Sequence, residues 1–170
     1  KTLSGGITVT GGSIRLGKTG TLASTVSMSG GKLEADETLT LSGALSHTAD
    51  ITIDVAGDKI FTYSGTAINV GANTITLSGG GSLVSGGMTL NDEDSKLLLN
   101  SITLDNASTS ANNSGIDVDA NSTVTSFSVG HTTPVSIKAN RTLSGSITVT
   151  AGSIKLGETG TLASAVTMSG

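Results

Sequence analysis

The chain has no cysteine, one proline (Pro134) and only three aromatic residues, Phe61, Tyr63 and Phe127, among its 170 residues. Without cysteine there can be no disulfide bond, no thiol chemistry and no cysteine-ligated metal. Aromatic side chains usually supply much of the buried area of a globular core. A core in this chain must therefore be built from Val, Ile, Leu and Ala, and we expect thin repeated layers rather than one bulky interior.

Charge is also scarce. Charged residues make up 13% of the chain, about half the usual share, and the net charge is −4. Nucleic-acid binding needs clustered Lys and Arg, so we expect no nucleic-acid partner. No apolar run reaches the roughly 18 residues of a membrane span, and no signal-peptide pattern is visible. The mean hydropathy of +0.18 nevertheless argues against disorder.

One stretch occurs twice. Residues 1–30 (KTLSGGITVTGGSIRLGKTGTLASTVSMSG) and residues 141–170 (RTLSGSITVTAGSIKLGETGTLASAVTMSG) are identical at 23 of 30 positions, without a gap, at an offset of 140. We interpret residues 1–140 as one repeat unit and residues 141–170 as the start of the next, continuous with the first. The chain also begins at Lys1 without Met, and we expect it to be an internal segment of a longer array.

Apolar and small polar residues alternate along most of the chain, which predicts strands with one buried face. The clearest alternations are Ile7–Thr10, Ser13–Leu16, Thr25–Met28, Thr38–Leu41, Ile51–Val55, Thr74–Leu77 and Ser136–Lys138. We interpret Ser95–Leu104 as a strand as well. Asn91–Asp94 and Asn106–Ser114 are polar and predict loops, and Pro134 is expected to open a strand or lie at a turn.

Two short phrases recur at uneven intervals. Thr-Leu-Ser-Gly occurs at Thr2–Gly5, Thr40–Gly43, Thr76–Gly79 and Thr142–Gly145, and a small residue followed by Asp or Asn occurs at Ala35-Asp36, Gly57-Asp58, Ala72-Asn73, Ala120-Asn121 and Ala139-Asn140. The second phrase has spacings of 22, 15, 48 and 19 residues, and the longest predicts two or three coils without a marker across Gly80–Ser114.

A repeat of about 20 residues cannot bury its apolar face alone, but it can when coils stack about 4.8 Å apart. We therefore predict an all-β parallel β-solenoid of roughly eight coils. An antiparallel β-sandwich, whose strands also recur every 8–12 residues, is the alternative fold.

The wording of the repeats resembles that of giant repetitive bacterial surface proteins, including autotransporter passengers and filamentous-haemagglutinin-like adhesins. The resemblance lies in phrases such as Asn73–Gly81 (NTITLSGGG), Gly12–Gly17 (GSIRLG) and Gly20–Ser24 (GTLAS). It implies a right-handed parallel β-helix, export, and a role as a stalk, fibre or adhesin. It supplies no catalytic residue for any position of this chain.

One phosphate-loop pattern is present, because Gly12–Thr19 matches G-x-x-x-x-G-K-T. That motif must follow a strand and open a helix. Here Ser13–Leu16 is itself a strand pattern and no helical period follows, while the second copy has Glu158 in place of Lys18. We interpret the match as a turn and a strand, and expect no nucleotide site.

Acidic residues cluster twice, at Asp92, Glu93 and Asp94 and at Asp117 and Asp119 near Asn121. Carboxylates can bind Ca²⁺, but neither the EF-hand nor the nonapeptide pattern is present, so solvated acidic loops are the main interpretation and weak Ca²⁺ binding the alternative.

Sugar-cleaving β-helices need a carboxylate pair or an acid–base cluster, and the acids here are scattered. Arg15 and Arg141 are the only arginines, and His47 and His131 lie in polar contexts typical of exposed turns. We predict no catalytic, cofactor-binding or metal-binding residue, no cofactor, and no enzymatic activity.

Thr-x-Thr pairs recur at Thr8/Thr10, Thr38/Thr40, Thr74/Thr76, Thr123/Thr125 and Thr148/Thr150. A flat threonine array could bind ice, but threonine is also a common strand residue that pairs well with itself. We expect a structural segment of an extracellular or cell-surface protein, acting as a rigid fibre, stalk or surface-layer filament. Its expected partners are copies of itself, associating end to end. The alternative is an adhesin module that binds a surface, a glycan or ice; the sequence names no ligand.

Overall fold

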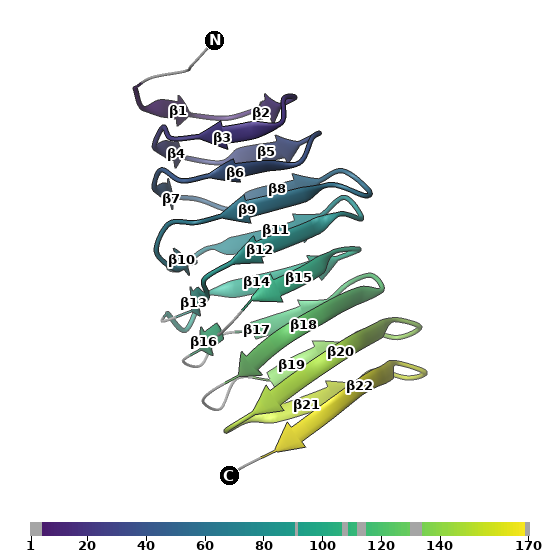
Figure 1. Ribbon diagram of the computed structural model, residues 1–170. Helices are drawn as coiled ribbons and strands as arrows, with labels where there is room; N and C mark the ends of the chain where they lie inside the picture. Colours follow the sequence, from purple (N-terminus) through teal and green to yellow (C-terminus); the bar gives the residue numbers. More distant parts are fainter. Residues whose placement is uncertain (1–4, 91, 107–108, 112–114, 130–133, 169–170) are drawn as a thin grey trace.

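The computed structural model describes residues 5–90, 92–106, 109–111, 115–129 and 134–168. Within these ranges every regular element is a strand, and every pairing between strands is parallel. Figure 1 shows the strands stacked as the rungs of one solenoid, with the two ends of the chain at opposite ends of the stack. The predicted all-β parallel solenoid is confirmed, and the β-sandwich alternative is wrong.

The solenoid has three faces, which the chain visits in turn. The first is an eight-stranded sheet of β2 (Ser13–Leu16), β5 (Gly31–Ala35), β8 (Ile51–Val55), β11 (Thr74–Ser78), β14 (Lys96–Asn100), β17 (Gly115–Val118), β19 (Pro134–Ile137) and β21 (Ser153–Leu156). The second face contains β3 (Gly20–Leu22), β6 (Leu39–Leu41), β9 (Ile60–Tyr63), β12 (Ser82–Ser85), β15 (Thr103–Asn106), β18 (Ser122–Val129), β20 (Thr142–Val149) and β22 (Thr161–Met168).

The third face is divided into two parts. Its first part is the three-stranded sheet of β1 (Ile7–Val9), β4 (Val26–Met28) and β7 (Leu45–His47). Its second part is formed by β10 (Ile68–Asn69), β13 (Met88–Leu90) and β16 (Thr109–Ala111), followed by the ends of the long strands β18, β20 and β22. The third face is therefore interrupted between β7 and β10, and it merges with the second face at β18.

The strand register gives the length of one turn. In the eight-stranded sheet Ser13 lies opposite Lys32, and the same column continues through Thr52, Thr76, Leu98, Asp117, Ser136 and Lys155. This column joins residues 142 positions apart in seven steps, or about 20 residues a turn. The 140-residue sequence repeat thus corresponds to seven turns with a difference of two residues, which keeps each side chain facing the same way because strands have a period of two.

The core is a continuous column of aliphatic side chains. Strands of the eight-stranded sheet alternate buried and half-buried residues, as in β8, where Ile51, Ile53 and Val55 point inward. Phe61 and Tyr63 of β9 are the aromatic residues in this buried set. Since each coil covers the apolar layer of its neighbours, stability comes mainly from contacts between adjacent coils.

The turn between the first and second faces has a recurring left-handed residue. All four non-glycine residues with positive φ lie there, one in each of four coils: Asp58, Ser101, Asn140 and Thr159. Asp and Asn tolerate this conformation better than other residues with a side chain. Four of the five predicted small-Asp/Asn phrases fall at this turn, whereas Ala72-Asn73 precedes β11 at another corner, which explains the uneven spacing.

Glycine is required where one coil passes close over the backbone of the next. Gly145 has φ +114°, and a Cβ atom there would overlap the carbonyl group of Val124 in the coil before. Gly31 stands in the same way against the carbonyl oxygen of Gly12. These positions fix the close approach of neighbouring coils at their corners.

Two loop and strand predictions need correction. Ser95–Leu104 is not one strand, because the chain turns a corner at Ser101 and forms β14 and β15 on different faces. Asn106–Ser114 is not entirely a loop, since Thr109–Ala111 forms β16 opposite Met88–Leu90, while residues 107–108 and 112–114 lie outside the described residues. Pro134 is the first residue of β19, as predicted.

Candidate functional site

The phosphate-loop match forms no phosphate cradle. Ser13–Leu16 is strand β2, and the chain continues through a short turn at Gly17–Thr19 into strand β3. No helix N-terminus follows the motif, so the backbone N–H groups that would bind a phosphate are not gathered in one place. The interpretation as a turn and a strand is confirmed.

The acidic loop before β14 is held by its own hydrogen bonds. The Asp94 N–H donates to Oδ1 of Asp92 (3.0 Å), and the Asp92 N–H donates to Oγ of Ser95 (3.1 Å). Asp117 and Asp119 lie on β17 and just after it, where they pair with Lys96 and Lys138. Among the described residues there is no group of three or more His, Cys, Asp or Glu side chains arranged to hold a metal ion.

His47 lies at the interruption of the third face. Its Nδ1 is 3.0 Å from the carbonyl oxygen of Ala49, and its Nε2 is 2.9 Å from the carbonyl oxygen of Asn69. The ring thus connects the end of β7 with β10 and is half-buried, so it is not the exposed turn residue that the sequence predicted. Both ring nitrogens face backbone carbonyls, which indicates a structural role. His131 lies outside the described residues.

The Thr-x-Thr pairs do not form one array. Thr8/Thr10 and Thr148/Thr150 belong to the third face, Thr38/Thr40 and Thr123/Thr125 to the second, and Thr74/Thr76 to the eight-stranded sheet. The longest threonine column contains Thr21, Thr40 and Thr62, and the next residue in it is Val84. A flat threonine face of the kind that ice binding would use is therefore not formed by these pairs.

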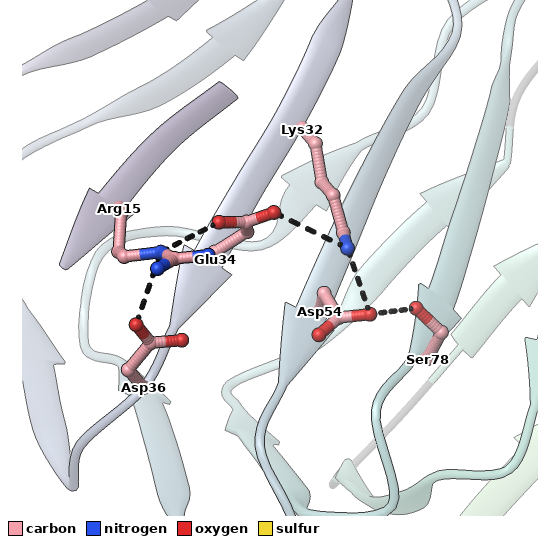
Figure 2. A network of polar contacts seen from close by, with 6 residues as sticks. All are labelled: Arg15, Lys32, Glu34, Asp36, Asp54 and Ser78. Atoms are coloured by element: carbon pink, nitrogen blue, oxygen red, sulfur yellow. Dashed lines mark hydrogen bonds and ion pairs between the residues drawn. The ribbon is translucent and has the colours of Figure 1, made fainter. Parts of the chain in front are cut away.

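The densest polar cluster lies on the outer side of the eight-stranded sheet (Figure 2). The Arg15 Nε lies 3.0 Å from Oε2 of Glu34 and 3.1 Å from Oδ2 of Asp36. Nζ of Lys32 lies 3.3 Å from both Oε1 of Glu34 and Oδ2 of Asp54. The Ser78 hydroxyl donates to Oδ2 of Asp54 at 2.6 Å. We call these six side chains the charge ladder.

The register explains why the charge ladder needs both cations. Glu34 and Asp54 lie directly opposite one another on β5 and β8, where two carboxylates repel. The Lys32 ammonium group lies between them and bonds to both (Figure 2). The ladder therefore connects β2, β5, β8 and β11 across four successive coils.

The same contacts shift the ionisation of three of these groups. The hydrogen bond from Arg15, supported by Lys32, lowers the pKa of Glu34 below its ordinary value. The pKa of Arg15 is raised by its bond to Glu34 and by the nearby charge of Asp36. Partial burial alone would lower the pKa of Lys32, but its bonds to Asp54 and Glu34 outweigh burial and raise it. All three groups are thus held in their charged forms.

A shallow open depression lies on the same sheet. Its lining includes Thr52, Thr74 and Thr76 together with Lys32 and Lys96. Both lysines already have carboxylate partners, since Lys32 pairs with Asp54 and Lys96 lies 2.9 Å from Asp117. The depression thus offers hydroxyl groups and neutralised cations, and no acid, base and nucleophile converge there.

Comparison with known protein families, curated proteins and solved structures gives no match for this chain. In the described ranges no helix is present that could cross a membrane. The geometry therefore carries the functional argument, and its strongest features are structural: a repeating coil, a continuous core and a ladder of charges that connects coils.

The charge ladder was not predicted from the sequence. Its signal was present in principle, because Lys32, Glu34 and Asp36 alternate on the outer side of β5, and Arg15 and Asp54 are 19 and 20 residues away from Glu34. Recognising it would have required the turn length at each coil. Asp54 and Asp117 do share the outer side of the eight-stranded sheet, but they lie in neighbouring columns rather than in equivalent positions.

Proposed function

We propose that the chain is a rigid structural segment of an extracellular repetitive protein, in which it acts as a spacer, stalk or filament. The observation that carries this proposal is the agreement between the 140-residue sequence repeat and seven turns of the solenoid. When a sequence repeats at a whole number of turns, successive units continue the same core and the same three faces. Extension by whole units then lengthens the rod without changing its cross-section.

The composition supports the same role. The surface carries many Thr and Ser residues and ion pairs that bridge adjacent coils, such as Arg15–Glu34 and Lys96–Asp117. Such groups keep a long rod soluble without creating a strongly charged field. The likeness of the repeats to those of autotransporter passengers and filamentous-haemagglutinin-like adhesins supports placement at a bacterial cell surface, with other copies of the chain as partners.

An adhesin module that recognises a glycan or ice is the weaker candidate. Glycan grooves usually present aromatic rings, whereas Phe61 and Tyr63 are buried in the core. The threonine pairs are divided among three faces. These observations favour a mechanical role over a binding role for this segment.

The proposal is tested with chains that contain one, two and three 140-residue units, studied by small-angle X-ray scattering. Seven steps of about 4.8 Å predict that each unit adds about 34 Å to the maximum dimension while the cross-sectional radius stays constant. Independent globules joined by flexible linkers would instead give a cross-section that changes with unit number, and that result would contradict a rigid spacer.

A further inference from the structure

The two copies of the repeated stretch differ in what covers them. Leu156 is 54% exposed and Met168 is 63% exposed, which makes them two of the most exposed large apolar residues among those described. Their counterparts in the first copy are Leu16, which is half-buried, and Met28, which is 2% exposed. The coil at residues 153–168, which we call the donor coil, therefore presents an apolar layer that the first copy keeps covered.

The first copy shows what covers such a layer. Leu16 lies opposite Ala35 on β5, and Met28 lies opposite His47 on β7. The coil at residues 31–47, which we call the acceptor coil, thus closes the apolar layer of residues 13–28. A segment with the sequence of the acceptor coil is the fitting cover for the donor coil.

The donor coil retains the groups that contact the acceptor coil. Residues 13–28 and 153–168 differ at four positions: Arg15/Lys155, Lys18/Glu158, Thr25/Ala165 and Ser27/Thr167. A lysine at the position of Arg15 still faces the carboxylate of Glu34, and a threonine at the position of Ser27 keeps a hydroxyl group opposite Ser46.

We propose that the donor coil of one copy replaces residues 13–28 of a second copy on its acceptor coil, so that copies join by strand exchange. This inference rests on the self-association included in the proposed function and specifies its interface. The acceptor coil is already covered by its own residues 13–28, so a second copy can bind there only by displacing them. The exchange conserves the number of coil-to-coil contacts, because one such interface is lost and an equivalent one forms.

The balance of free energy then depends on concentration. The displaced coil regains conformational entropy, and the association of two chains costs translational and rotational entropy. Exchange is therefore expected at high protein concentration. Closure of the donor coil also places Lys155 beside Glu34 and Asp36, whereas direct stacking on β2 without displacement would place it beside Arg15, a like charge.

Disulfide trapping tests the interface directly, because the full chain has no cysteine of its own. In one copy Ser27 lies opposite Ser46, so exchange places Thr167 of one copy opposite Ser46 of another. Opposed residues on adjacent parallel strands have Cα atoms about 5 Å apart, within the range of a disulfide. The full-length variants S46C and T167C are mixed at high concentration under oxidising conditions.

The expected result is a disulfide-linked dimer in the mixture, and no such dimer with either variant alone. The mixture of T8C and T167C provides the comparison, because direct stacking of the donor coil over β1 would place residue 167 opposite residue 8. Linkage of that pair without linkage of S46C and T167C would overturn the proposal. Monomers in both mixtures would also overturn it, yet would leave the spacer function intact if the single rods keep their expected length.

Two charge substitutions supply a matched control. Met168→Asp changes an exposed residue of the donor coil and should abolish linkage of S46C with T167C, whereas Ile60→Asp changes a residue that is 43% exposed on the second face and should leave it unaffected. Equal loss with both substitutions would indicate general hydrophobic association and contradict the assigned interface.

Discussion

Residues 7–28 and residues 147–168 have nearly the same sequence, lie at opposite ends of the stack and differ in structure. In the first copy β3 and β4 are separate three-residue strands, whereas the same stretch in the second copy is the single eight-residue strand β22. Thr159 has φ +60° at the turn before β22, but its counterpart Thr19 is not among the residues with positive φ. Corner geometry in this solenoid therefore depends on the neighbouring coils as well as on local sequence.

The neighbours identify the cause. β4 pairs with β1 on one side and β7 on the other, in a third face that has its own sheet. β22 pairs with β20 along its whole length, because the second and third faces have already merged at β18. A coil thus copies the corner of the coil on which it stacks, and the comparison between copies can be tested by making the same substitution in each.

The largest expected difference is at the corner glycines. Gly145→Ala would place a Cβ against the Val124 carbonyl at a φ that side chains avoid, and we expect a loss of about 3–5 kcal/mol in the free energy of unfolding. Gly5→Ala has a similar φ of +107° but nothing within 4 Å, so the loss should be about 1 kcal/mol. Urea denaturation measures both, and equal losses would refute the idea that contact between coils dominates.

The second expected difference is in the core layer. Met28→Ala removes a side chain that is 2% exposed and should cost about 3 kcal/mol. Met168→Ala changes a side chain that is 63% exposed and should alter stability by less than about 0.5 kcal/mol in the monomer. Thermal unfolding at low protein concentration separates the two, and a large loss for Met168→Ala would mean that this residue is covered in solution.

A smaller difference is expected at the left-handed turn. Thr159→Asn should raise the free energy of unfolding by about 0.5 kcal/mol, because asparagine tolerates positive φ better than a β-branched residue. The gain is reduced by the loss of the hydroxyl group that bonds to Oδ1 of Asn140. Thr19→Asn should bring no gain, and a gain of equal size would show that both turns have the same backbone conformation.

The smallest expected effect concerns the charge ladder and pH. The pKa of Glu34 is lowered in the folded state by Arg15, so its contribution is present above the ordinary glutamate value of 4.5 and is lost as the pH falls through the lowered value. Glu34→Gln should therefore destabilise the protein at pH 6, and the difference from the unsubstituted chain should shrink toward pH 3.

The second copy supplies the control for this titration. Lys155 replaces Arg15 there and lies opposite Ser136, which carries no charge. Lys155→Gln should leave the pH dependence of unfolding between pH 6 and pH 3 unchanged. A constant effect of Glu34→Gln across that range would show that the ladder does not influence the ionisation of Glu34.

Much of the fold could be predicted from the sequence because it depends on local patterns. Alternation in stretches such as Ile51–Val55 gives strands with one buried side, and the scarcity of aromatic residues favours thin layers. The Asp and Asn of Gly57-Asp58 and Ala139-Asn140 mark a left-handed turn that recurs in successive coils. These signals need only the chemistry of a few adjacent residues.

What the sequence did not predict depends on contacts about 20 residues apart. The partners of Glu34 could be identified only once the turn length on each side of β5 was known. Strand β16 is built from the polar residues Thr109–Ala111 and forms because β13 offers an edge beside it. The same argument covers His47, whose two carbonyl partners lie on either side of the interruption in the third face.

The most direct test of the account is the distance between Ser13 and Ser153, measured by double electron–electron resonance with spin labels at introduced cysteines. Both residues begin outer-face strands of the eight-stranded sheet, seven steps apart. Seven steps of about 4.8 Å predict one narrow distribution centred near 34 Å. A distribution centred below about 20 Å would mean that the two copies fold back beside one another, and it would contradict the stacked solenoid.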